Sequence, residues 1–203
     1  MKLYWCENTR AFRIIWMLDE LGQPYERIRV DVRGGETGEN KSDPDFRAAS
    51  PMGKVPALVD GPVKLWDSGA ICLYLADKYP EAGLSVAADD PRRGEFLQWL
   101  MFTNAVIEPA MLEKFMELPP KPQSYGHGSF ESMIGALEKG LKGRDWLMGD
   151  RFTAADVLVG SSVHVLQQFG LLPVITALQG YVARCRIRPG LQKALALDGV
   201  TKK

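Results

Sequence analysis

The chain lacks any excess of charge. Its 203 residues include 25 Lys and Arg against 25 Asp and Glu, which gives a formal net charge of zero at pH 7. A protein that holds nucleic acid through a broad basic face, or a membrane through a polybasic segment, needs an excess of positive charge. We therefore expect neither a nucleic-acid partner nor a membrane partner.

Cysteine and histidine are also scarce. The three cysteines are Cys6, Cys72 and Cys185, and no pair has the spacing of a CxxC or zinc motif. Three widely separated cysteines argue against a disulfide framework and favour a reducing compartment. For the two histidines, His127 and His164, we expect structural roles, and we expect no metal site.

Long hydrophobic runs are missing as well. No segment approaches the roughly 18 uncharged apolar residues that a membrane-spanning helix requires. The N-terminus reaches Lys2 and Glu7 too early to contain the apolar core of a signal peptide. Hydrophobic residues still make up 46% of the chain and charged residues 25%, as in globular proteins with a buried core. These features favour a cytoplasmic globular protein.

Patterns typical of strands and helices alternate over the first eighty residues. The apolar spacing predicts strands at 2–6, 24–32, 55–59 and 62–66, and helices at 12–21 and 69–78. Gly22 suits the end of the first helix, and Asp60-Gly61 is typical of a hairpin turn. Residues 34–44 read as a polar loop. This order, β-α-β-loop-β-β-α, predicts a small mixed sheet with helices packed on it.

The composition changes after residues 81–91, which resemble a linker. Every later pattern is helical, with predicted helices at 92–114, 130–141, 154–169, 172–186 and 189–197. Pro109 should kink or divide the first of these helices. Thr153 and Asp156 have the spacing of a capping box. We therefore predict two domains, 1–80 and an all-helical 92–203, joined by the linker.

The turn between the first strand and the first helix is a candidate site for chemistry. It contains Cys6, Asn8, Thr9 and Arg10, which offer a thiol, an amide, a hydroxyl and a fixed charge. A helix N-terminus presents unpaired N–H groups and can stabilise a thiolate. The same residues also suit ordinary helix capping. For Cys6, at the end of a strand, we favour a buried and inert thiol.

Two further segments could hold a peptide-like ligand. A Val55-Pro56 step at the start of a strand suggests a turn, and a cis peptide bond is one form of it. Such a turn leaves the preceding backbone groups to pair with a ligand. Asp67 and Ser68 open a helix, where capping explains them, but the same geometry suits an α-amino acid group. Ser68 and the helix N–H groups would then hold the carboxylate, and Asp67 the ammonium.

Taken together and in this order, these motifs resemble those of a cytosolic glutathione S-transferase, over residues 1–189. The resemblance implies an α/β thioredoxin-like N-terminal domain, β-α-β-α-β-β-α, that binds glutathione. It also implies an all-α C-terminal helical domain that binds the electrophile. The glutathione-binding residues it implies are Arg10, Lys54, Val55, Pro56, Asp67 and Ser68. Val55 would pair through its backbone with the cysteinyl part, and Asp67 and Ser68 would hold the γ-glutamyl end.

The residue that activates the thiol departs from the patterns of this family. Counted back from Gly22, the position of the serine or cysteine in such members holds Asn8, with Thr9 next to it. The corresponding tyrosine position holds Tyr4. We rank Thr9 first as the catalytic residue, then Asn8, then Tyr4, with Cys6 last.

The resemblance implies a glutathione transferase that joins the glutathione thiolate, as co-substrate, to small hydrophobic electrophiles in detoxification. Alternatives are a glutathione-dependent isomerase, dehalogenase or reductase, and a non-catalytic binding or regulatory protein. We expect an electrophile pocket between the domains, walled by Trp99, Phe102, Thr103 and Val106. The same apolar residues would also suit a helix core.

The resemblance also implies a homodimer. Three charged residues at the head of the second domain could form pairs between domains or subunits, or could simply be solvated. They are Arg92, Arg93 and Glu95.

Overall fold

Four short strands near the start of the chain form one mixed sheet. They are β1 Lys2–Trp5, β2 Glu26–Arg29, β3 Ala57–Asp60 and β4 Val63–Trp66, in the order β2-β1-β3-β4. The computed structural model describes residues 1–34 and 38–199. In it β1 pairs parallel with β2, while the pairs β1–β3 and β3–β4 are antiparallel. The strands are shorter than predicted, most of all β2.

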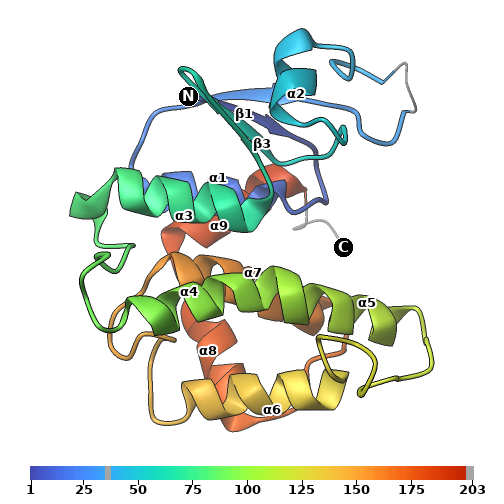
Figure 1. The fold of residues 1–203 in the computed structure, drawn as a ribbon, viewed down its shortest axis with the longest axis vertical. Helices are drawn as coiled ribbons and strands as arrows, with labels where there is room; N and C mark the ends of the chain where they lie inside the picture. The colour runs from blue at the N-terminus through green and yellow to red at the C-terminus, as the bar shows by residue number, and fades with distance from the viewer. Residues whose placement is uncertain (35–37, 200–203) are drawn as a thin grey trace. The chain divides into compact units, whose positions relative to one another are not determined.

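Helices cover both faces of this sheet. Helices α1 (Ala11–Leu21) and α3 (Ser68–Lys78) lie on one side, and α2 (Pro44–Ala49) lies on the other (Figure 1). A short 3-10 turn, η2, follows α3 at Pro80–Ala82. The predicted thioredoxin-like order β-α-β-α-β-β-α is confirmed.

Helix α1 is buried almost all round because it contacts β1, α3 and also α9 (Pro189–Asp198). Gly22 ends α1 in the left-handed conformation, as predicted, with φ of 64°. At the start of α9, a Cβ on Gly190 would lie 2.9 Å from Cδ1 of Trp16. Only glycine therefore lets the two helices approach this closely.

Helix α2 was not located from the sequence, where residues 34–44 were expected to form a loop. Asp43 is its N-cap, and its side chain accepts hydrogen bonds from the N–H groups of Asp45 (2.8 Å) and Phe46 (3.0 Å). Pro44 occupies the first turn, where no N–H is needed. Residues 35–37 of the expected loop lie outside the described residues.

The second half of the chain is helical, as predicted. Its helices are α4 Arg93–Phe102, η3 Thr103–Ile107, α5 Glu108–Phe115, α6 Phe130–Leu141, α7 Ala154–Gln168 and α8 Thr176–Arg186. The predicted helix at 92–114 is divided beside Pro109, because η3 is a π-helical turn that leads into α5. Helix α8 starts later than predicted, after Pro173, because a proline disfavours the helical conformation of the residue before it.

The capping box at the start of α7 is confirmed. The carboxylate of Asp156 accepts hydrogen bonds from the Thr153 N–H at 2.9 Å, the Leu147 N–H at 3.0 Å and the Tyr181 hydroxyl at 3.1 Å. Asp156 is fully buried, and burial raises its pKa to about 6. This carboxylate ties the N-terminus of α7 to α8 and to the loop before it.

The chain divides into two compact units that differ from a simple split in sequence. One unit contains Met1–Ala82 together with Arg188–Lys203, and the other contains Gly83–Ile187. The last helix, α9, therefore belongs to the unit that contains the sheet and not to the unit of residues 83–187. The domain limits 1–80 and 92–203 stay a prediction. Among the described residues, every helix is too short or too polar to cross a membrane.

Candidate functional site

The sheet topology brings the three predicted binding segments to one end of the first unit. Tyr4 of β1 pairs with Ala57 of β3, and Ala57 pairs with Trp66 of β4. Because β3 runs antiparallel to both neighbours, the segments that follow β1 and β4 leave the sheet where β3 begins. The turn at 6–10, the Val55-Pro56 step and the Asp67-Ser68 helix start therefore gather at that end.

The turn after β1 has a fixed and partly strained backbone. Asn8 adopts a left-handed conformation, with φ of 53°, and its side chain is exposed. The Thr9 hydroxyl donates to the carbonyl of Cys6 at 2.7 Å and accepts from the N–H of Ala11 at 3.2 Å. Thr9 thus binds the first N–H of α1, just before the N-cap residue Arg10. Its proton could reach a ligand sulfur only after the hydroxyl turned away from Cys6.

Tyr4 lies on the face of the sheet that packs against α2. Its ring lies 5.4 Å from that of Phe46, and its hydroxyl donates to Asp43 at 3.3 Å. Burial, reinforced by Asp43 and Asp45, raises the pKa of Tyr4 to about 12. This environment makes Tyr4 the least favoured of the three candidate activating residues. The expectation that Cys6 is buried is confirmed.

The Val55-Pro56 peptide bond is cis. Val55 precedes β3, whose pairing begins at Ala57, so its backbone groups lie outside the ladder. Just before it, the side chain of Ser50 accepts from the Lys54 N–H at 2.9 Å and donates to the Lys54 carbonyl at 2.8 Å. This pair of bonds holds the turn that presents Val55. The Lys54 side chain is exposed.

Asp67 and Ser68 occupy the N-terminus of α3. Asp67 is the N-cap, with φ of 76°, and its carboxylate accepts from the N–H groups of Gly69 (2.8 Å) and Ala70 (3.2 Å). Asp67 is exposed, whereas Ser68 is buried. Arg13 of α1 donates to the Ser68 hydroxyl at 3.3 Å and is itself buried. The local cap was predicted, and the contact with Arg13 was not.

Three charged residues of this region were missed from the sequence. Arg13 is a charged residue among the apolar residues of α1, and this position is the only sequence feature that could have indicated its burial. Arg33 donates to the carbonyls of Glu7 (3.0 Å) and Asn8 (3.2 Å), and Asp198 accepts from the Asn8 N–H at 2.9 Å. No local pattern in the sequence points to Arg33 or Asp198.

The four residues predicted to wall an electrophile pocket belong to α4 and η3 in the second unit. Trp99 and Thr103 are buried there, and Phe102 and Val106 are half-buried. The Trp99 ring packs against Gly140 of α6 and contacts the Phe102 ring edge-on at 5.3 Å. These contacts belong to the helical core of the second unit. A pocket at these residues stays a prediction.

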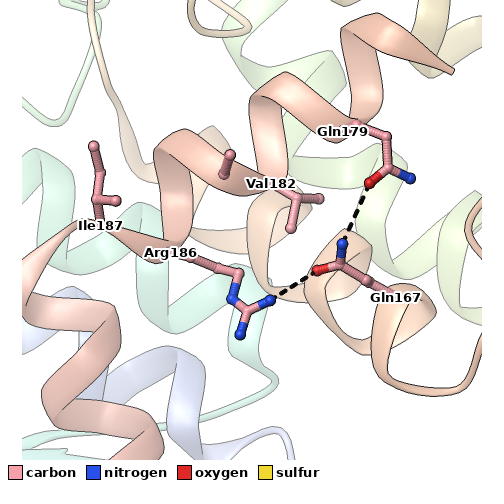
Figure 2. A pocket seen from close by; sticks show the side chains of 6 residues that line it. Gln167, Gln179, Val182, Arg186 and Ile187 are labelled. Atoms are coloured by element: carbon pink, nitrogen blue, oxygen red, sulfur yellow. Dashed lines mark hydrogen bonds between the residues drawn. The ribbon is translucent and has the colours of Figure 1, made fainter. Parts of the chain in front are cut away.

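A separate cavity of about 360 Å³ lies within the second unit, between α7 and α8 (Figure 2). Its polar wall is a chain of hydrogen bonds in which Arg186 donates to Gln167 and Gln167 donates to Gln179, each at 3.3 Å. Val182 and Ile187 form part of its apolar wall. None of the predicted site residues lines this cavity.

The two histidines have different surroundings. His127 pairs with Glu113 at 2.8 Å, and His164 is buried in α7. Among residues 1–34 and 38–199, no group of three or more His, Cys, Asp and Glu side chains could hold a metal ion.

The charged residues considered for pairs between domains or subunits have partners within the second unit. Arg92 pairs with Asp90 at 2.7 Å, and Glu95 pairs with Arg144 at 2.7 Å. Arg93 donates to the carbonyl of Val86 at 2.6 Å. These contacts leave the predicted homodimer without support from this group.

Family models identify both halves of the chain. The glutathione S-transferase N-terminal domain matches residues 1–77, and the C-terminal domain matches residues 127–189. Glutathione S-transferase Z2 of Arabidopsis thaliana is 32% identical, over 79% of this chain and 73% of its own length. The chain therefore belongs to the glutathione S-transferase family.

Two further similarities bear on what the chain does. The disulfide-bond oxidoreductase YfcG of Escherichia coli K12 is 28% identical, over 95% of this chain and 93% of its own length. A solved structure of a sphingomonad glutathione S-transferase complexed with glutathione is 29% identical, with a TM-score of 0.79. That likeness covers 99% of this chain and all of the other.

Proposed function

We propose that this protein binds glutathione at the end of the sheet in its first unit and uses the glutathione thiolate to attack small hydrophobic electrophiles. The observation that carries the proposal is the convergence of three segments at that end, the turn after β1, the Val55-Pro56 step and the start of α3. The likeness to a structure complexed with glutathione supports it.

Each segment supplies a different part of the binding. The backbone of Val55 pairs with the cysteinyl part of glutathione. The Ser68 hydroxyl, at the start of α3, holds the γ-glutamyl carboxylate, while the exposed Asp67 faces its ammonium. Arg10 and Lys54 are exposed and offer positive charge to the other carboxylate. Glutathione in this orientation brings its sulfur to Asn8 and Thr9.

Activation of the thiol then depends on the turn after β1. A free thiol, with a pKa of about 8.5, is mostly protonated at neutral pH. A hydrogen bond from the Thr9 hydroxyl or the Asn8 amide, together with the positive end of the α1 dipole, favours the thiolate. The exposed amide of Asn8 can donate without breaking a contact, whereas the Thr9 hydroxyl must leave the Cys6 carbonyl.

Calorimetry with glutathione tests the binding proposal. Ser68→Ala should weaken glutathione binding about 10-fold or more, because a charged carboxylate loses a hydrogen bond. Ser129→Ala is the matched control, since Ser129 is also a serine at a helix start but caps α6 in the second unit. Equal affinities for the parent and Ser68→Ala would remove Ser68 from the site.

The activating residue is tested by titrating the bound thiol, whose thiolate absorbs in the ultraviolet. Thr9→Val and Asn8→Ala should each be compared with Tyr4→Phe, which changes a hydroxyl buried against α2. Loss of the activating donor should raise the pKa of the bound thiol and lower kcat/KM about 10-fold, or about 1.4 kcal/mol. A shift in Tyr4→Phe alone would move the role to Tyr4.

A second candidate function is glutathione-dependent disulfide reduction, which the similarity to YfcG favours. The same thiolate would attack a disulfide sulfur in place of an electrophilic carbon, which forms a mixed disulfide, breaks the original S–S bond and releases the other sulfur as a thiolate; a second glutathione then reduces the mixed disulfide to give glutathione disulfide. Parallel assays with a chlorodinitrobenzene and with hydroxyethyl disulfide, both with glutathione, separate the two reactions. Binding of glutathione without turnover of either compound would instead indicate a non-catalytic binding protein.

A further inference from the structure

The turn that carries Asn8 and Thr9 is held by a residue from the other end of the chain. Asp198, the last residue of α9, is 2% exposed, and its carboxylate accepts the backbone N–H of Asn8 at 2.9 Å. A buried carboxylate is costly unless it is hydrogen-bonded. The Asn8 N–H is therefore bound to Asp198 and unavailable to a ligand.

Arg33 holds the same peptide from its other side. Its guanidinium donates to the carbonyls of Glu7 at 3.0 Å and Asn8 at 3.2 Å. Asn8 thus has a negative partner on its N–H and a positive partner on its C=O. A left-handed conformation is unfavourable for a residue other than glycine, although asparagine, as at Asn8, tolerates it better than most. Hydrogen bonds on both sides of Asn8 offset that cost.

We infer that Asp198 is a positioning residue, one that fixes the turn that activates the thiol. This inference rests on the proposed function. In this role Asp198 acts through Asn8 and not by contact with glutathione or the electrophile. Its carboxylate sets the backbone of Asn8, and the backbone sets where the Asn8 amide and the Thr9 hydroxyl point. The packing of α9 on α1 brings this carboxylate to the turn. The last helix of the chain therefore helps to position the turn that follows β1.

The charge of Asp198 can change near neutral pH. Its pKa is raised to about 7, mainly by burial and also by the negative charge of Glu7, while the Asn8 N–H and Arg33 act in the opposite direction. A carboxylate accepts an amide hydrogen more strongly than a protonated carboxyl does. The turn is therefore held more firmly above pH 7 than below it.

The test compares two substitutions of one residue. Asp198→Ala removes the acceptor. We expect kcat for conjugation of glutathione to an electrophile to fall about 10-fold, while KM for glutathione stays within about 2-fold of the parent value. Asp198→Asn keeps an oxygen acceptor and should restore kcat to within about 3-fold of the parent. The control is Arg188→Ala, which loosens α9 at its other end and should not reproduce the loss of kcat.

Amide NMR supplies a readout that does not depend on activity. In the parent, the Asn8 amide signal should titrate near pH 7, and in Asp198→Asn this titration should be absent. A parent that fails to bind glutathione in calorimetry overturns the proposed function, but the Asn8 titration still tests the contact.

Three results would overturn the role of Asp198. They are an Asn8 signal that does not titrate, a folded Asp198→Ala protein with parental kcat, and an equal loss of kcat in Arg188→Ala. If Asp198→Ala does not fold, the titration of Asn8 in the parent and in Asp198→Asn decides.

Discussion

His164 shows how burial controls a single side chain. It is 3% exposed in α7, and neither ring nitrogen has a hydrogen-bond partner among the described residues. Burial, with a smaller effect from the positive charge of Arg186, lowers the pKa of His164 to about 4. The ring is therefore neutral in the folded protein, and it becomes charged near pH 6.5 once the chain unfolds.

This difference predicts a loss of stability in acid. Between pH 6.5 and 4 the unfolded chain binds a proton that folded His164 does not, so the free energy of unfolding falls as pH falls. The full effect is on the order of 3 kcal/mol. His164→Leu should remove it, because leucine does not titrate and no hydrogen bond is lost. Urea unfolding of both proteins across this pH range measures the effect.

The difference between the two proteins matters here, because other buried groups act in the opposite direction. Burial raises the pKa of Asp156 to about 6 and that of Asp198 to about 7, so each contributes stability that is lost as pH rises. Both aspartates are present in the parent and in His164→Leu, and their effects cancel in the comparison. Parallel stability curves for the two proteins would contradict the prediction.

Single residues were predicted well from the sequence where their partners are close along the chain. The Thr153 and Asp156 capping box and the Gly22 helix end depend on neighbours within a few residues, and both are confirmed. Asp198 and Asn8 are 190 residues apart, and Arg13 and Ser68 are 55 apart. Contacts of that kind follow from the packing of elements, which a single sequence does not contain.

At the scale of an element, α6 offers a direct test of packing. It contains Gly135, which is exposed and where a Cβ would meet nothing within 4 Å, and Gly140, where a Cβ would overlap the Trp99 ring. Gly135→Ala should stabilise the protein by up to about 1 kcal/mol, because alanine favours helix. Gly140→Ala should destabilise it by about 1–3 kcal/mol, because the rigid indole must move. Thermal unfolding of both variants measures the contrast.

The pair in α6 separates packing from helix propensity. Both substitutions gain the same propensity, so a difference in their effects comes from the contact with Trp99. If both variants became more stable than the parent, Trp99 would not pack on Gly140 in solution.

Elements were predicted where one residue imposes the boundary. Pro109 divides the predicted helix at 92–114, and α6 begins and ends where the pattern placed it. Helix α2 was missed because it is six residues long and its start, Asp43-Pro44, lies in a segment that otherwise reads as a loop. The fold class could be predicted because local patterns indicate most of the element order and the family resemblance implies the rest.

At the scale of the whole chain, the two ends meet in one unit. Residues 188–199 return to α1, where Glu20 takes part in the contact. Its carboxylate accepts two bonds from Arg188, at 2.7 and 2.5 Å, and one from Trp16 Nε1 at 2.8 Å. The sequence alone did not indicate this return, because nothing in the pattern of α9 marks α1 as its partner.

The Arg188 contact should contribute measurably to the stability of the first unit. The Glu20 side chain is 11% exposed, so Arg188→Ala leaves a largely buried carboxylate without its two-bond cationic partner, at a cost of about 2 kcal/mol. Lys193→Ala is the matched control, because Lys193 joins the same two helices through Asp19 but its side chain is 61% exposed. Loss of that pair should leave stability nearly unchanged, since solvent screens it. Equal unfolding midpoints in urea for both variants would show that burial of Glu20 does not decide how firmly the end of the chain holds to its beginning.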